Sequence, residues 1–248
     1  MNRFSRTALV AASFLLLAVP QGPWAKSMTL KAPAKKISPA ALTADADKRT
    51  QDSVLASLEA GNARFRKGFA ASEAKEEAVA GSSTRGPKVM VLACSDPRVI
   101  PEKIFNAKPG ELFVVRVAGN VATNETVASL EYGAEQLNIP VIVVLGHQNC
   151  TVVKSCLEAM DVPDTENRRS MVMKSLYSHL EPACEVAKGE GLKGEGLLNK
   201  AIEENVKNSI RAILENSPSM WNMHKAGKLR VVGALYSKQT GQVYWLDK

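Results

Sequence analysis

Three short runs of apolar, mostly β-branched residues constrain the fold of this chain most strongly. Each comes just after a proline or glycine, and they are KVMVLA (Lys88–Ala93), LFVVRVA (Leu112–Ala118) and VIVVLG (Val141–Gly146). Such runs are typical of strands buried on both faces. Between the second and third runs, apolar residues recur at helical spacing, at Val127, Leu130, Ala134 and Leu137. Strand, helix and strand in this order predict an α/β fold with a mostly parallel central sheet flanked by helices.

The C-terminal segments predict a different connection. LRVVGALY (Leu229–Tyr236) and QVYWLD (Gln242–Asp247) flank a polar turn that contains Gly241, as in a β-hairpin. We therefore expect the parallel sheet to end in an antiparallel edge hairpin.

Helices are expected on both sides of these runs. Thr50–Ala70 carries apolar residues at mixed three- and four-residue spacings with Gly61 between them, which predicts one amphipathic helix or a helix pair. A further helix is expected from about Cys150. The glycine-rich segment Lys188–Gly196 is expected to be flexible and to lead into a strong helix.

The N-terminus is expected to direct export. Residues 1–25 place Arg3 and Arg6 before an apolar run, Ala8–Val19, as in a secretory signal peptide. We therefore expect a periplasmic or secreted protein with no stable membrane span after cleavage; an uncleaved anchor is the alternative. Residues 26–48 are rich in Lys, Ala and Pro and predict a flexible tether. Residues 49–248 are then expected to form a single α/β domain, which would carry any functional site.

The charge pattern gives little support for a nucleic-acid partner. The formal net charge is +7, but much of the excess lies near the N-terminus, and elsewhere Lys and Arg alternate with Asp and Glu. Aromatic residues make up only 5% of the chain. We expect no nucleic-acid binding.

Potential metal ligands follow the first and third apolar runs. Cys94 comes directly after one run, His147 directly after the other, and Cys150 three residues later. Parallel strands end at one edge of a sheet, where α/β proteins bind ligands. Two thiolates and an imidazole suit Zn²⁺, and three protein ligands leave a fourth position free. The alternatives are buried structural cysteines beside a hydrogen-bonded histidine, or disulfides in an oxidising compartment.

Asp96 and Arg98 lie two and four residues beyond Cys94. A salt bridge between them would hold Asp96 ionised and oriented beside the metal. Two thiolates cancel the charge of Zn²⁺, so the ion should acidify water less than in an all-histidine site, and a nearby carboxylate would compensate. The alternative role for Asp96 is to cap the turn before Pro97.

The remaining cysteines and histidines give weaker signals. Cys156 is expected to face the core, and Cys184 is either a free thiol or its partner. His179 and His224 have no acidic or cysteine partner at ligand spacing, which favours surface or core roles.

Three motifs stand in a fixed order, and they are CSDPR (Cys94–Arg98), RVAGN (Arg116–Asn120) and GHQNC (Gly146–Cys150). Together they resemble the signatures of β-class carbonic anhydrases, and the resemblance extends from about Leu58 to Tyr236. It implies one Zn²⁺ per subunit on Cys94, His147 and Cys150, an Asp96–Arg98 catalytic dyad, and a homodimer or homotetramer. The implied reaction is reversible hydration of carbon dioxide to bicarbonate and a proton by zinc-bound hydroxide. The family also has a closed form, in which Asp96 would become the fourth ligand.

Four positions depart from the family pattern, namely Val117, Gln148, Thr151 and Val152. Larger side chains at 151 and 152 are expected to narrow substrate access or change its hydrogen bonding. Three alternative functions therefore stay open: a hydrolase of a sulfur analogue of carbon dioxide, a thiol-redox protein that uses Cys94 and Cys150, and a catalytically silent zinc fold that serves assembly.

Overall fold

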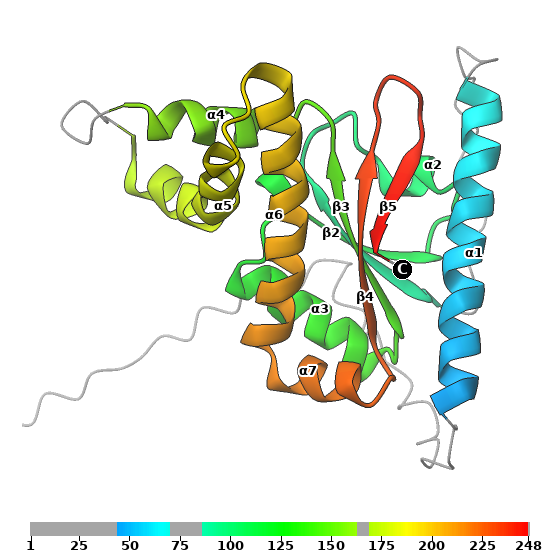
Figure 1. Ribbon diagram of the computed structural model, residues 1–248. Helices are drawn as coiled ribbons and strands as arrows, with labels where there is room; N and C mark the ends of the chain where they lie inside the picture. Colours follow the sequence, from blue (N-terminus) through cyan, green and yellow to red (C-terminus); the bar gives the residue numbers. More distant parts are fainter. Residues whose placement is uncertain (1–43, 70–85, 163–168, 248) are drawn as a thin grey trace, which may run out of the picture. The chain divides into compact units, whose positions relative to one another are not determined.

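A five-stranded sheet with the order β2-β1-β3-β4-β5 forms the centre of the protein (Figure 1). The computed structural model describes residues 44–69, 86–162 and 169–247. The strands are β1 (Val89–Cys94), β2 (Leu112–Val117), β3 (Val141–His147), β4 (Arg230–Tyr236) and β5 (Val243–Asp247). Neighbours among the first four pair in parallel, and β5 pairs with β4 antiparallel. The predicted parallel sheet with an antiparallel edge is confirmed.

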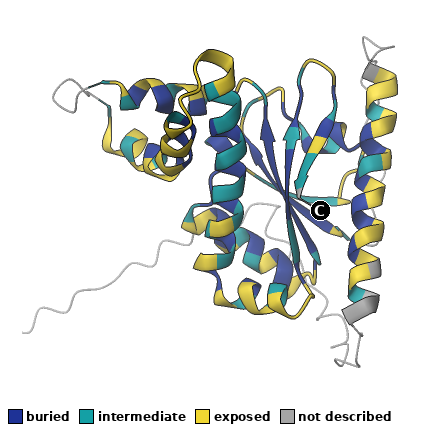
Figure 2. Cartoon of the chain, in the orientation of Figure 1, coloured by how far each residue is buried: buried dark blue, intermediate teal, exposed yellow. Residues whose placement is uncertain are grey.

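The strands differ in how deeply they are buried. Strands β1 and β3 are buried at every residue (Figure 2), whereas β4, which also has a neighbour on each side, is only partly buried. Strand β2 is only half-buried, because it lies at an edge. The prediction that all three apolar runs are buried on both faces was therefore wrong for β2, although its location was right.

Helices cover both faces of the sheet (Figure 1). One face packs against α1 (Ala44–Phe69) and α2 (Pro101–Ile104), and the other against α3 (Asn124–Gln136), α6 (Gly194–Asn216) and α7 (Pro218–Lys225). A third cluster of buried residues joins α4 (Thr151–Met160) and α5 (Met171–Gly189) to α6 and to the end of β1. This third cluster contains Cys94 and Cys150, so it surrounds the predicted metal site.

Helix α1 begins earlier than predicted, and at Gly61 it follows one of the two predicted alternatives. It begins at Ala44, so residues 44–48 are helical rather than part of a tether. It is a single helix that passes through Gly61 without a break. A Cβ atom at Gly61 would lie 1.9 Å from the carbonyl oxygen of Phe105. Glycine is needed here for close packing of α1 on the residue after α2, and not for a turn.

The remaining predictions for the segments between elements have mixed outcomes. The predicted flexible segment at 188–196 is reduced to a short turn, because α5 ends at Gly189 and α6 begins at Gly194. The predicted signal peptide and most of the predicted tether lie outside the described residues. Within the described part of the chain, no helix is long and apolar enough to cross a membrane.

Asn62 connects α1 to two distant parts of the chain. Its Nδ2 donates to the carbonyl oxygens of Ile104 (3.0 Å) and Gly241 (2.9 Å), and its Oδ1 accepts from the amide of Val243 (3.1 Å). Asn62 is buried, so each unmade bond would leave a desolvated polar group. These bonds fix α1 against α2 and the β4–β5 hairpin.

Candidate metal centre

Adjacent strand ends bring the three predicted ligands together. Cys94 is the last residue of β1 and His147 the last of β3, and these strands are parallel neighbours. After His147 the amide of Gln148 donates to the carbonyl oxygen of Tyr236 (3.0 Å), and Asn149 adopts a left-handed conformation with φ 54°. Asparagine tolerates this conformation well. The chain thereby turns back, and Cys150 becomes the residue that precedes α4.

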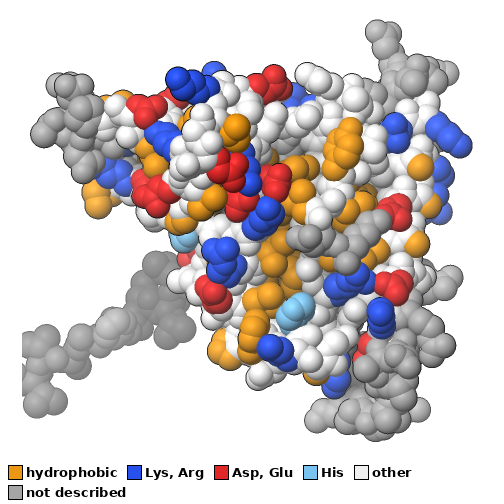
Figure 3. Space-filling view, in the orientation of Figure 1, with side chains coloured by type: hydrophobic (Ala, Val, Ile, Leu, Met, Phe, Trp, Pro, Cys, Tyr) orange, Lys and Arg blue, Asp and Glu red, His pale blue; other side chains and the backbone are white. Residues whose placement is uncertain are grey.

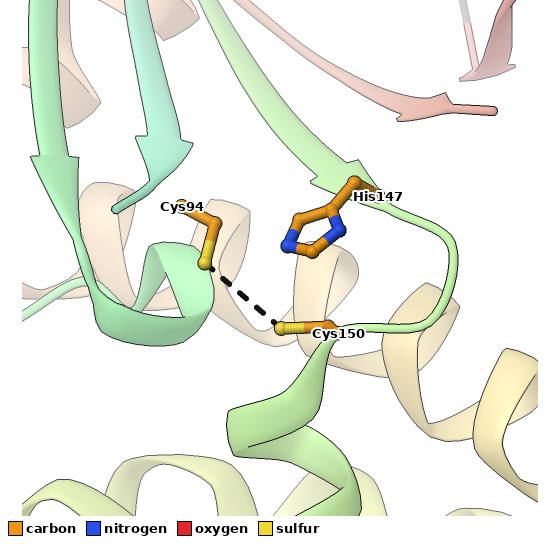
Figure 4. A group of neighbouring side chains, drawn as sticks. All are labelled: Cys94, His147 and Cys150. Carbon is orange, nitrogen blue, oxygen red and sulfur yellow. Dashed lines mark hydrogen bonds between the residues drawn. The ribbon is translucent and has the colours of Figure 1, made fainter. Parts of the chain in front are cut away.

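The side chains of Cys94, His147 and Cys150 point toward one another (Figure 4). Their ligand atoms all lie within 4.8 Å of one another, and all three residues are buried. The sequence-based prediction that these residues share one site agrees with this geometry.

His147 presents an unpartnered nitrogen to this group. Its Nδ1 lies 3.0 Å from the carbonyl oxygen of Gln148. A carbonyl only accepts, so Nδ1 carries the proton and Nε2 carries a free lone pair. Nε2 is buried and has no hydrogen-bond partner among the described residues. A metal ion between the sulfurs and Nε2 would satisfy it, and a backbone carbonyl on the other nitrogen is the usual arrangement for a metal-binding histidine.

The two thiols are arranged as a coupled pair. Their Sγ atoms lie 4.0 Å apart, and the amide of Gly119 donates to Cys94 Sγ (3.4 Å). The hydrogen bond from Cys150 lowers the pKa of Cys94, with further help from His147 and backbone amides and against the effect of burial. The same bond and burial raise the pKa of Cys150. Both cysteines are free thiols. A disulfide would leave His147 Nε2 unpaired, whereas Zn²⁺ would favour both thiolates and use that nitrogen.

Asp96 and Arg98 form the predicted pair. Arg98 Nε donates to Asp96 Oδ1 (2.9 Å) and Arg98 Nη2 to Oδ2 (2.7 Å), and the Arg98 amide also donates to Oδ1 (2.9 Å). The Asp96 side chain is 6% exposed, and that of Arg98 is 62% exposed. The hydrogen bond from Arg98 is the main reason that the pKa of Asp96 lies well below its usual range. Asp96 is not in the ligand group within the described residues, because its carboxylate is turned toward Arg98.

Two further basic residues contact this loop, and sequence analysis assigned neither a role. Lys238 Nζ lies 3.4 Å from Asp96 Oδ2 and 3.4 Å from the Asn149 carbonyl oxygen, with its side chain 14% exposed. Arg116 Nε donates to the Cys94 carbonyl oxygen (3.1 Å) and Arg116 Nη2 to that of Asp96 (2.6 Å). Arg116 was visible only as part of the RVAGN motif. Lys238 follows β4, and no local pattern connects it with Asp96.

The other candidates lie elsewhere. His179 is exposed on α5, and His224 Nδ1 lies 3.1 Å from the Leu229 carbonyl oxygen. The prediction of surface or core roles for both agrees with these positions. Cys156 and Cys184 are both fully buried, so Cys156 faces the core as predicted.

Comparison with known proteins identifies the family. Residues 89–243 match the family described as "Carbonic anhydrase". The chain belongs to the β-carbonic anhydrase family. It is 30% identical over 188 residues to a carbonic anhydrase of Mycolicibacterium smegmatis. The aligned region covers 75% of this chain and 88% of that relative. The predicted family, fold class and enzyme class, carbonate dehydratase, are confirmed.

Two solved structures show the same fold. The β-carbonic anhydrase CcaA superposes with a TM-score of 0.59 and 27% identity, over 67% of this chain and 81% of that one. A tetrameric β-carbonic anhydrase from Sordaria macrospora has a TM-score of 0.58 and 20% identity, over 81% and 95% of the two chains. The central sheet and its flanking helices are therefore the β-carbonic anhydrase architecture.

The four positions that depart from the β-carbonic anhydrase pattern have different surroundings. Thr151 is exposed, whereas Val117 and Val152 are half-buried and pack into the cluster around the candidate ligands. Gln148 lines a cavity of about 300 Å³ between β4, β5 and α6, and its Oε1 is buried without a partner among the described residues. None of the three candidate ligands lines this cavity. Two of these positions adjoin Cys94: Val117 is its register partner in β2, and Val152 Cγ1 would lie 3.0 Å from a Cβ atom at Gly119, whose amide donates to Cys94 Sγ.

Proposed function

We propose that this β-carbonic anhydrase catalyses the zinc-dependent, reversible hydration of carbon dioxide to bicarbonate and a proton. Cys94, His147 and Cys150 would hold one Zn²⁺ per chain. The observation that carries the proposal is the buried Nε2 of His147, which has no hydrogen-bond partner in the described part of the chain and faces two thiols in a ligand group no wider than 4.8 Å. Three protein ligands leave the fourth position to water and substrate.

Each ligand residue has a defined task in this proposal. A zinc ion held here would lower the pKa of water and so supply a nucleophile for carbon dioxide at near-neutral pH. His147 is held in one orientation because Nδ1 donates to the Gln148 carbonyl, which leaves Nε2 directed at the ligand group. The Gly119 amide stabilises negative charge on Cys94 Sγ. Burial of the group excludes bulk water and strengthens each of these interactions.

Asp96 acts as an oriented acceptor and not as a strong base. Each of its oxygens already accepts two hydrogen bonds, three in all from Arg98 and one from Lys238. These donors keep the carboxylate ionised and away from the ligand group. The hydrogen bond from Lys238 is the longest of the four, at 3.4 Å. Oδ2 can therefore most readily replace this bond with one from water or substrate. Arg98 therefore keeps the fourth position open by holding Asp96.

Zinc analysis and a stopped-flow assay of carbon dioxide hydration across pH test this proposal. We expect one zinc per chain and activity that rises with pH. Asp96→Ala should lose activity and keep zinc. Asp161→Ala is the control for loss of a carboxylate ion pair away from the site, since Asp161 is exposed and pairs with Lys188 (2.6 Å) on α5. Zinc-loaded protein that is silent at every pH would contradict the proposal. A zinc-free protein with Cys94 and Cys150 oxidised would support the thiol-redox alternative.

We further propose that the chain is exported through its N-terminal segment and acts in the periplasm or outside the cell. The support is the sequence pattern at residues 1–25, with Arg3 and Arg6 before the apolar run. N-terminal sequencing of the protein from cell fractions tests it. We expect a start after the run Ala8–Val19 in the exported fraction; an intact Met1 in cytosol alone would refute it.

We also propose that the enzyme is a homodimer or homotetramer. The edge strand β2 is only half-buried despite its apolar sequence LFVVRV, and an unpaired apolar edge is a liability in a monomer. Hydrophobic side chains also form a band between α6 and the β4–β5 hairpin (Figure 3), where Tyr244 is 47% exposed. Size-exclusion chromatography with light scattering should give a mass two or four times that of one chain. A monomer at micromolar concentration would contradict this.

A further inference from the structure

Cys156 and Cys184 form a second pair of buried cysteines that the zinc site does not use. Cys156 lies on α4 and Cys184 on α5, and both are fully buried in the same cluster. Neither belongs to the ligand group of Cys94, His147 and Cys150. Both are free thiols.

The helix geometry places both thiols on the packed faces of α4 and α5. Cys156 Sγ lies 4.0 Å from the carbonyl oxygen of Tyr177 on α5. In an α-helix this oxygen accepts from residue 181, so the sulfur lies beside the turn from 177 to 181. Cys184 lies about two turns beyond Tyr177 on the same face, and helical side chains lean toward the N-terminus. Its thiol therefore leans back toward Cys156.

The titration behaviour of the two thiols agrees with this proximity. The hydrogen bond with Cys156 is the first cause that raises the pKa of Cys184, followed by burial. The same bond lowers the pKa of Cys156, against burial. For both thiols, the other cysteine is the first cause of the shift in pKa.

We propose that Cys156 and Cys184 are an oxidisable dithiol that closes into a disulfide between α4 and α5. The oxidant is a small-molecule or protein disulfide, such as the one in oxidised glutathione. The two S–H bonds break and one S–S bond forms, while two electrons and two protons pass to the oxidant, which leaves as two thiols. Because both cysteines are buried, exchange takes place during folding or during local opening of the two helices.

The crosslink would act on the zinc site through α4. This helix begins directly after Cys150, and Cys156 lies in its second turn. The disulfide closes the chain from 156 to 184 and so restricts the unfolded state. It also limits displacement of α4, and with it of Cys150. We expect a rise in melting temperature of roughly 5–10 °C and slower release of zinc to a chelator.

Refolding of the full chain with zinc in glutathione redox buffers tests the proposal. Free thiols are alkylated, the protein is digested, and the peptides are mapped by mass. We expect one linked peptide pair containing Cys156 and Cys184, two hydrogens lighter than the reduced peptides, with Cys94 and Cys150 alkylated. The melting temperature should rise with oxidation in the unaltered chain and stay constant in Cys184→Ala.

Two results would overturn the proposal. One is alkylation of all four cysteines even in the most oxidising buffer. The other is a linkage that involves Cys94 or Cys150 in place of this pair. The mapping uses the unaltered chain, so it decides the matter even where Cys184→Ala does not fold. Neither readout depends on carbon dioxide hydration, so failure of the proposed activity would not be mistaken for failure of the dithiol.

Discussion

Substitution of Gly119 by alanine should destabilise the protein at the edge of the candidate metal centre. Gly119 has φ 70°, and its amide donates to Cys94 Sγ. An added Cβ would lie 3.0 Å from Val152 Cγ1 and 3.2 Å from Leu180 Cδ2. The left-handed conformation costs a side chain about 1–2 kcal/mol, and overpacking of a buried site costs about 1–3 kcal/mol. We therefore expect Gly119→Ala to lower the free energy of unfolding by roughly 2–5 kcal/mol and to weaken zinc binding.

Two further variants separate the causes in urea denaturation monitored by circular dichroism at a fixed zinc concentration. Gly191→Ala is the matched control, because Gly191 has φ 69° and no atom within 4 Å of an added Cβ. This variant should lose only about 1–2 kcal/mol of unfolding free energy. Val152→Ala in the Gly119→Ala background removes the nearest clashing atom and should recover about 1 kcal/mol or more. A loss in Gly119→Ala no larger than in Gly191→Ala, or no recovery with Val152→Ala, would refute this reasoning.

Three other predictions follow from the hydrogen bonds. Asn62→Ala leaves three buried backbone groups unpaired and should cost about 2–4 kcal/mol in urea unfolding; a loss below about 0.5 kcal/mol would contradict it. Arg98→Ala should lower kcat/KM for carbon dioxide hydration at least about 10-fold and Lys238→Met less, because Arg98 makes three of the four bonds to Asp96; the reverse order would contradict the assigned roles. The lowered pKa of Asp96 contributes stability that is present above the unfolded pKa near 4 and is lost as pH falls below it. Between pH 6 and pH 2, the free energy of unfolding should therefore fall less in Asp96→Asn than in the unaltered chain. Equal falls would rule this contribution out.

The sheet could be predicted from sequence because its strands are continuous apolar runs between turn residues. Strand order could not be predicted, because the crossover that places β2 at an edge leaves no local pattern. The partial exposure of β2 follows from that order. Gly61 shows a second limit, because its meaning depends on Phe105, which is distant in the chain. Propensity alone left one helix and a helix pair both open, whereas packing requires a small residue inside one helix.

The three candidate ligands were predictable because strand ends in a parallel sheet meet at one edge. Asp96 and Arg98 were predictable because they lie in the same short turn as Cys94. Lys238 was not, since it lies 142 residues from Asp96 and reaches it only through the order of the strands. The unpartnered Nε2 of His147 was also beyond the sequence, because it depends on where the Gln148 carbonyl points.

The fourth ligand of zinc in a crystal structure of the zinc-loaded enzyme near neutral pH tests the central claim most directly. We predict Zn²⁺ on Cys94, His147 Nε2 and Cys150, with a water molecule as fourth ligand and Asp96 still bonded to Arg98. An Asp96 oxygen bound to zinc at that pH would contradict the open site. A Cys94–Cys150 disulfide without metal would contradict the zinc centre itself.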